Sequence, residues 1–368
     1  MIEAVLDRTT VASLVEDCGL GRLQEIAAAP AGWADPTLGQ SALAAELSRG
    51  RVVVRVDSER AELEVKREVD LAFFLRNQGF PAPQPVEDRR GRHHREVGDR
   101  HVVVFRSLDG RVKPVTQLLP THVEACGRAI AEFQALGRTY KKGVEGRHGF
   151  EFVAERWMAL RDRLPPFLRK VVRTINDEIE YLGGYLEGKL PKGVILRDLE
   201  PERLLVKGDK LVGILHLGGV CRGKYIFDLA AAINALCFVD GAYDLKRFES
   251  LLTGYESVRP LSLAEWDAFP SELRLAAVRL VVRRLDEAAS GPLGLSVLSA
   301  IAGAMASPRD DGFPGPVQLF LDGYNRLLTL RREREGGMDD LLLALATGYD
   351  YRKYQKIRAP QRRRNRSS

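Results

Sequence analysis

The stretch that decides the fold is VILRDLEPERLLVKGDKLVGILHLGG, residues 194–219. An apolar strand leads to Asp198, a short loop follows, and two further apolar segments around KGDK are typical of a hairpin. The second strand of that hairpin ends at His216. An Asp that begins a loop is more often a turn or cap residue than a functional one. Its meaning therefore depends on the residues around it.

Phosphoryl transfer would give this pattern a chemical purpose. Such a site needs a carboxylate near the acceptor hydroxyl, ligands that hold magnesium against the phosphates, and a cation that orients them. Kinase loops supply them as H-x-D-x-x-x-x-N, followed by an Asp on the next hairpin. Here Asp198 stands at the carboxylate position. However, Leu196 replaces the His, Arg203 replaces the Asn, and His216 replaces the second Asp.

The first 110 residues predict strands with one helix packed across them. SALAAEL and RVVVRVD flank the turn SRG (48–50) as a hairpin, and GDRHVVVFRSL is a further strand. AELEVKREVDLAFFLRNQG (61–79) has apolar residues at helical spacing. We expect residues 10–28 to be one helix and the Gly- and Pro-rich residues 30–41 to be a loop.

From residue 121 the apolar pattern becomes helical, apart from the strand region 193–219. Helices are expected over 121–137, 150–163, 166–187, 227–238, 244–257, 262–288 and 316–332. The predicted fold class is α+β, with a small β-rich lobe over 1–112, a helical lobe over 113–348 and a tail over 349–368. A bilobal fold of this layout binds a nucleotide between its lobes.

The positive charge of the chain lies in its tail. The chain has 56 Lys and Arg, 50 Asp and Glu, and a net charge of +6. Residues 351–368 hold eight of the basic residues and no acid, so the rest is close to neutral. The composition favours a disordered tail, which could contact an acidic partner. Four widely spaced cysteines, no apolar run long enough to span a bilayer and no signal-peptide pattern favour a cytoplasmic location.

The chain resembles bacterial type II homoserine kinases and their aminoglycoside phosphotransferase relatives. The similarity is carried by residues 194–219, by FDLAAAINALCF, and by LAFFLRNQGFPAPQPVEDRRGR (71–92). It continues through LLTGYESVRPLSLAEWDAFPSELRLAAVRLVVRRL (251–285) and covers most of residues 10–290. The resemblance implies a bilobal kinase-like fold with ATP between the lobes and a small-molecule acceptor over the helical lobe.

The resemblance also implies roles for individual residues. Asp198 would be the catalytic base, and Asp228 would be the buried carboxylate that braces the catalytic loop. Arg55 would occupy the position of the phosphate-orienting Lys of many relatives, with Glu64 or Glu68 as its helix partner. Pro201 of the loop is retained.

Departures from the family pattern fall on the positions that hold the metal. Arg203 cannot ligate magnesium, because a guanidinium is always protonated and has only donors. His216 is a poor replacement for an Asp, because magnesium prefers oxygen ligands. Loss of one preorganised charge stabiliser lowers a rate by about a hundred- to a thousand-fold. No metal-binding residues are therefore assigned.

Three interpretations of these replacements remain open. They are drift in an inactive site, a cationic cleft in which Arg55, Arg197 and Arg203 hold an anion without metal, or an active kinase that uses Glu200 or Glu202 as displaced ligands. We expect a pseudokinase that acts as a binding or regulatory module, with an active ATP-dependent small-molecule phosphotransferase as the alternative. Its ligand would be ATP, with weak or absent magnesium dependence, or another anionic small molecule.

Overall fold

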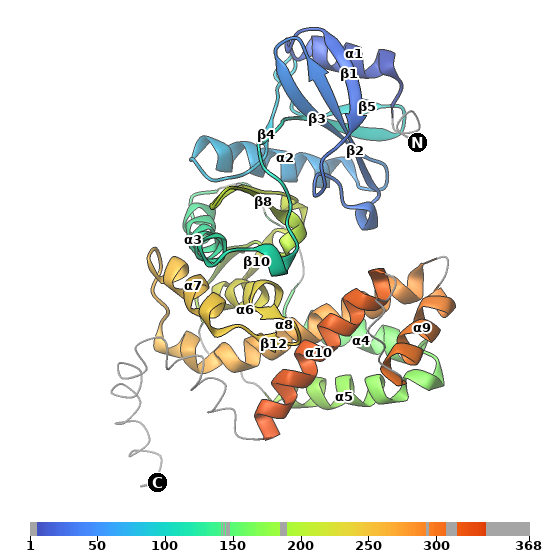
Figure 1. Ribbon diagram of the computed structural model, residues 1–368, viewed down its shortest axis with the longest axis vertical. Coiled ribbons are helices and arrows are strands. Elements are labelled where there is room, and N and C mark those ends of the chain that lie inside the picture. The colour runs from blue at the N-terminus through green and yellow to red at the C-terminus, as the bar shows by residue number, and fades with distance from the viewer. Residues whose placement is uncertain are drawn as a thin grey trace.

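The computed structural model describes residues 6–140, 142, 144, 148–184, 190–291, 294–306 and 315–335. Figure 1 shows a small part that contains a sheet and a larger, mostly helical part, with helix α2 (Glu62–Asn77) between the sheet and the helical part. This arrangement confirms the predicted α+β bilobal fold. The division at residues 112 and 113 stays a prediction, and the tail over 349–368 lies outside the described residues. No helix in the described ranges is both long and apolar enough to cross a membrane.

The small part holds one antiparallel sheet in the order β1-β2-β3-β6-β4, with β5 also paired to β6. The predicted hairpin of β2 and β3 is confirmed, with Leu47 opposite Gly50. The strands are β1 (Leu23–Ala28), β2 (Gln40–Leu47), β3 (Gly50–Asp57), β4 (Gln84–Pro85), β5 (Arg95–Val97) and β6 (Arg100–Arg106).

Strand β3 presents different side chains to its two faces, because successive residues of a strand alternate. Val52, Val54 and Val56 are buried in one apolar cluster with residues of helix α1 (Arg8–Asp17). Val53 packs on the other side with residues of α2. Arg55 and Asp57 share that second face. The alternation therefore points the Arg55 side chain at α2.

The prediction of one helix over residues 10–28 was wrong in its second half. Helix α1 ends at Asp17, and residues 23–28 form β1. Gly19 and Gly21 have φ angles of 66° and 94°, which a helix cannot accommodate and which favour glycine. Residues 23–28 then pair with β2 along the edge of the sheet.

The helical part follows the predicted helices closely, with one addition, α9, that the sequence pattern did not predict. Its helices are α3 (Pro120–Gly137), α4 (Phe150–Arg161), α5 (Arg169–Gly183), α6 (Tyr225–Leu236), α7 (Leu245–Glu256), α8 (Leu263–Ser290), α9 (Gly294–Ala306) and α10 (Gly315–Glu335). Its strands form three antiparallel pairs, β7 (Lys192–Ile195) with β10 (Cys221–Lys224), β8 (Leu204–Lys207) with β9 (Lys210–Ile214), and β11 (Phe238–Val239) with β12 (Ala242–Tyr243).

The sheet and the helical part contact each other directly. The Ile214 N–H donates to the Pro81 carbonyl over 2.7 Å. Arg111, in the segment that joins the two parts, forms an isolated bridge with Val206 of β8. Apolar residues from both parts also share one buried cluster. These contacts place the β8–β9 hairpin against the sheet.

Candidate active site

Asp228 of helix α6 holds the loop that follows β7. Its carboxylate accepts the N–H groups of Leu196 at 2.9 Å and Arg197 at 2.6 Å, and the side-chain amide of Gln134 at 3.4 Å. These hydrogen bonds fit the role that the resemblance implies for Asp228, a buried carboxylate that braces the loop. Burial raises the pKa of Asp228 to about 7, although the two backbone N–H groups act in the opposite direction.

Arg197 turns the chain so that Asp198 faces the cleft. Its φ angle is 70°, in the left-handed region that favours glycine. An arginine at this φ carries backbone strain. The Arg197 side chain folds back on the loop, where its Nε donates to Asp198 Oδ2 over 3.1 Å.

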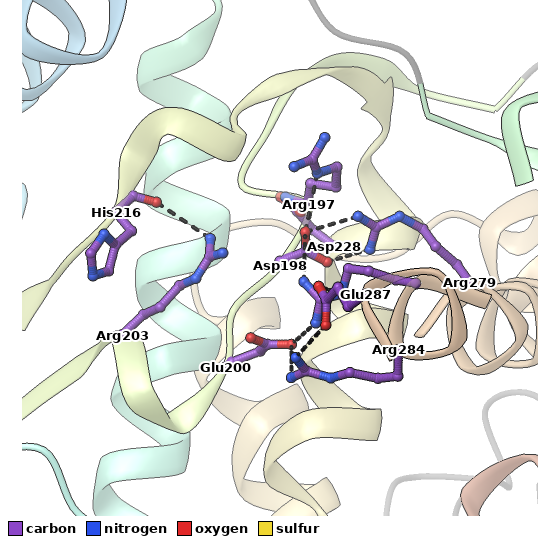
Figure 2. A network of polar contacts seen from close by, with 10 residues as sticks. Arg197, Asp198, Glu200, Arg203, His216, Asp228, Arg279, Arg284 and Glu287 are labelled. Carbon is purple, nitrogen blue, oxygen red and sulfur yellow. Dashed lines mark hydrogen bonds and ion pairs between the residues drawn. The ribbon is translucent and has the colours of Figure 1, made fainter. Parts of the chain in front are cut away.

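Asp198 is surrounded by guanidinium groups. Arg279 of helix α8 binds both of its oxygens, with 2.9 Å from Nη2 to Oδ2, and Arg283 Nη1 lies 3.8 Å from Oδ2. Figure 2 shows the Asp198 carboxylate between Arg197 and Arg279. Burial would raise the pKa of Asp198, but the attraction of Arg279, Arg283 and Arg197 outweighs it and holds that pKa well below its usual value.

The β8–β9 hairpin places Arg203 beside His216. Pro201 begins a short 3-10 helix that ends at Arg203, immediately before β8, and His216 follows β9. The Arg203 Nη1 donates to the main-chain oxygen of His216 over 3.3 Å, as Figure 2 shows. Burial and then the charge of Arg203 lower the pKa of His216 to about 4, so its imidazole is neutral at pH 7.

Arg55 and Glu68 form the ion pair that links β3 to α2. Both terminal nitrogens of Arg55 bind the Glu68 carboxylate over 3.0 Å, and its Nε binds Asp57 over 3.1 Å. Arg60 completes the group through Asp57 at 3.1 Å and Glu68 at 2.6 Å. Burial would raise the pKa of Glu68, but Arg55 and Arg60 lower it. Every nitrogen of the Arg55 guanidinium is therefore used within the protein.

A cavity of about 510 Å³ brings these groups together between the lobes. Asp198, Arg203, His216, Glu64 and Glu68 line it. Its guanidinium groups, within the part of the chain that the structure describes, come from Arg60, Arg67, Arg197, Arg203 and Arg283.

The structure separates the predicted site residues into three groups. Asp198, Arg203, His216 and Glu68 meet in the cavity, while Pro201 and Asp228 stand behind it. Glu64 also lines the cavity but is exposed and does not pair with Arg55, so Glu68 is the helix partner. Arg55 does not line the cavity, because Glu68 and Asp57 hold its guanidinium. Of the three interpretations left open by the sequence, the cationic cleft therefore keeps Arg197 and Arg203 but not Arg55.

The sequence analysis did not predict the arginines that bind Asp198, because they lie far from it along the chain. Arg279 and Arg283 belong to an otherwise apolar segment of α8 and stand one turn apart, on the same face. That spacing was a signal that a carboxylate faces them. It could not indicate which carboxylate, because Asp198 is 81 residues away along the chain.

Residues 37–261 match the phosphotransferase enzyme family. The chain belongs to this family. Homoserine kinase of Methylobacillus flagellatus is 30% identical over 240 residues, which cover 65% of this chain and 73% of that protein. Homoserine kinase of Methylobacterium radiotolerans is 32% identical over 285 residues, which cover 74% and 81%.

Solved structures of low sequence identity share the family fold. One is the amicoumacin kinase hAmiN in complex with AMP-PNP, Ca2+ and Ami, with a TM-score of 0.61, 14% identity, and coverage of 90% of this chain and 94% of that one. Another is the microcompartment-associated aminopropanol kinase, with a TM-score of 0.59, 17% identity, and coverage of 89% and 98%.

The residues at the two metal-ligand positions do not fit magnesium. Arg203 presents only donors there, and its positive charge lies against the backbone of the second position. The His216 imidazole offers nitrogen, whereas magnesium requires near-octahedral oxygen ligands. Glu200, which the sequence suggested as a displaced ligand, is paired with Arg283 and Arg284 instead.

Proposed function

We propose that this protein is a catalytically impaired member of the family that works as a binding or regulatory module for a small anionic molecule. One observation carries the proposal, which is the hydrogen bond from Arg203 to the main chain of His216. The two positions that would share a magnesium ion are instead bridged by a fixed positive charge. A metal placed there would be repelled by that charge. The described residues hold no group of three or more His, Cys, Asp or Glu side chains placed to bind a metal ion.

The environment of Asp198 supports the same proposal. A general base must accept a proton from the acceptor, and its efficiency falls as its pKa moves far below the working pH. Arg279 and Arg197 already donate three hydrogen bonds to this carboxylate. Asp198 is therefore better suited to hold arginines in place than to remove a proton.

Arg203 gives the cavity its anion-binding character. Arg203 is 9% exposed. Among the described residues it has no ion pair with a carboxylate, only the hydrogen bond to the main chain of His216. A buried guanidinium with unused donors favours a phosphate or carboxylate, which it can bind through two parallel hydrogen bonds. Arg197 lines the same cavity. Anion binding at this place needs no metal.

The alternative is an active ATP-dependent small-molecule phosphotransferase, and the Arg55–Glu68 pair favours it. An ion pair between this strand and this helix is one of the arrangements that an active kinase requires, and it is bidentate here. The alternative must nevertheless explain how nucleotide phosphates are neutralised without the two metal ligands.

Steady-state assays separate the two functions. We expect no ATP hydrolysis and no phosphate transfer to homoserine, related amino alcohols or aminoglycosides above the rate of Asp198→Ala. Turnover in the range of about 1–100 per second that is typical of kinases, abolished by Asp198→Ala, would establish the active enzyme instead.

Binding assays test the anion site directly. Pyrophosphate should bind in the presence of a chelator, and its affinity should fall as salt rises. Arg203→Gln should weaken this binding, whereas Arg128→Gln, which removes an exposed arginine of α3 outside the cavity, should not. Equal affinities of the two variants would count against the proposed site.

A further inference from the structure

The loop between β1 and β2 enters the space between the lobes and buries Trp33 there. Trp33 is 3% exposed, although it belongs to a connecting loop rich in Gly and Pro. Its ring lies 5.9 Å from that of Phe105, centroid to centroid, at an angle of 50°. The buried cluster around it combines both parts of the molecule: Val53, Val65, Val69, Val103, Phe105, Leu205 and Leu215.

Gly32 allows the loop to approach this closely. Its φ angle is 85°, and a Cβ added to it would lie 2.7 Å from the main-chain oxygen of Glu202 and 2.7 Å from Val112 Cγ2. No side chain other than hydrogen fits there without displacement. The loop therefore touches both the segment that joins the lobes and the β8–β9 region.

The buried indole adjoins the anion cavity. Leu215 of the Trp33 cluster directly precedes His216, and Glu202, which Gly32 touches, directly precedes Arg203. The same loop continues along the cavity, where Asp35 and Leu38 form part of the wall. The cleft thus has a polar end with arginines and an apolar end that an aromatic bicycle fills.

A nucleotide would require both ends of this cleft. Its phosphates would face Arg203 and Arg197. Its base would need an apolar place between the lobes, such as the one that Val53, Phe105 and Leu205 form around Trp33. An indole and a purine are fused bicyclic rings of the same size. We propose that Trp33 occupies the place of a nucleotide base, so that the site takes phosphate-bearing molecules without a base and excludes nucleosides.

This inference extends the proposed function, because it names which anions the cavity accepts. In the wild-type protein the base of ADP should add nothing to binding. ADP should bind no more than about threefold tighter than pyrophosphate, and adenosine should not bind. A base could bind only when Trp33 has left its place, and the apparent affinity for the base falls in proportion to how rarely that open state is populated. Wild-type affinity for ADP more than about tenfold above that for pyrophosphate would overturn the inference.

Removal of the indole provides the second arm of the experiment. Trp33→Ala should gain adenosine binding, measured by calorimetry, with an affinity at least about tenfold above that of the wild type. Trp33→Leu, which keeps an apolar side chain, serves if the alanine variant does not fold. Trp266→Leu on α8 is the control for loss of an indole outside the Trp33 cluster and should stay unable to bind adenosine.

The adenosine and pyrophosphate measurements test this inference and the proposed function separately. Adenosine carries no charge, so its binding to the Trp33 variants does not depend on the arginines. If folded Trp33 variants fail to bind adenosine, the apolar end is not a base site and the inference is wrong. If they bind adenosine while no form binds pyrophosphate, Trp33 does occupy the place of the base, and the anion site that the proposed function requires is what fails.

Discussion

Arg279, on helix α8, binds both carboxylate oxygens of Asp198, which follows strand β7. The pair joins the loop after β7 to the longest helix that the structure describes, and both side chains are at least nine-tenths buried. An ion pair in such a place is strongly coupled, because removal of one partner leaves an uncompensated buried charge. Asp198 therefore has a structural role whether or not it has a chemical one.

A double-mutant cycle measures this coupling. Asp198→Asn and Arg279→Met should each destabilise the protein, and the double variant should be more stable than the sum of the two predicts, by about 1–3 kcal/mol. Urea unfolding of the four proteins gives the coupling energy. The half-exposed pair of Arg156 and Asp286 is a control, for which we expect less than about 1 kcal/mol. A coupling near zero for the buried pair would show that Arg279 does not hold Asp198 in solution.

In regular structure a glycine variant is usually less stable than an alanine variant, but the positive φ of Arg197 predicts the reverse at this position. Arg197→Gly and Arg197→Ala both remove the guanidinium and differ only in the Cβ. At a φ of 70° the glycine variant should be the more stable, by about 1 kcal/mol. Thermal and urea unfolding provide the comparison. Greater stability of the alanine variant, which is usual in regular structure, would indicate a different turn.

Local patterns predicted much of this fold. The β2–β3 hairpin and helix α2 follow from alternation and helical spacing that agree with their tertiary contacts. Strand β1 did not follow, since its pairing with β2 is a long-range contact that apolar periodicity does not record. Helix α9 is built of small and apolar residues with two glycines, and it lacks the charged face that would mark a helix.

The sequence predicted the contacts of a site residue only where a buried polar side chain must have hydrogen-bond partners. A carboxylate at the start of the apolar helix α6 must be hydrogen-bonded, so the bonds of Asp228 to the loop could be anticipated. Two other features depend on how separate segments pack. Asp57 and Glu68 bind the Arg55 guanidinium, and Trp33 is buried between the lobes. The sequence contains those residues but not their distances.

Asp228 should make the stability of the protein depend on pH. Its pKa is about 7 in the folded protein and 3.8 as a free side chain, so it adds stability below pH 4 that is lost as pH rises through 7. Asp228→Ala lacks this term and also leaves two loop N–H groups without their acceptor, so it should be destabilised by about 3–5 kcal/mol.

A comparison at two pH values separates the effect of Asp228 ionisation on stability from the effects of other groups. The difference in unfolding free energy between wild type and Asp228→Ala should be about 2–3 kcal/mol larger at pH 5 than at pH 8. Glu249→Ala, an exposed acid of α7, should change stability by no more than about 0.5 kcal/mol at either pH. A difference that does not change with pH would mean that Asp228 stays ionised throughout.

Restoration of the family's metal ligands tests the proposal that Arg203 and His216 exclude magnesium. Arg203→Asn removes the fixed charge, and His216→Asp supplies an oxygen donor in place of a neutral imidazole. Pyrophosphate is the appropriate probe because it reaches the polar end of the cleft without requiring space for a base. Its binding to the wild type should be independent of magnesium, whereas its binding to the double variant should require magnesium.

Calorimetry with magnesium and with a chelator makes the comparison, and the two single variants are the matched controls. Each should bind pyrophosphate more weakly than the wild type under chelation, because Arg203→Asn removes the guanidinium and His216→Asp places a negative charge beside it, while neither change alone completes a metal site. Phosphate transfer is not expected to return, since Leu196 and Arg197 still shape the loop around Asp198. Equal pyrophosphate affinity of the double variant with and without magnesium would show that the two replacements are not what excludes the metal.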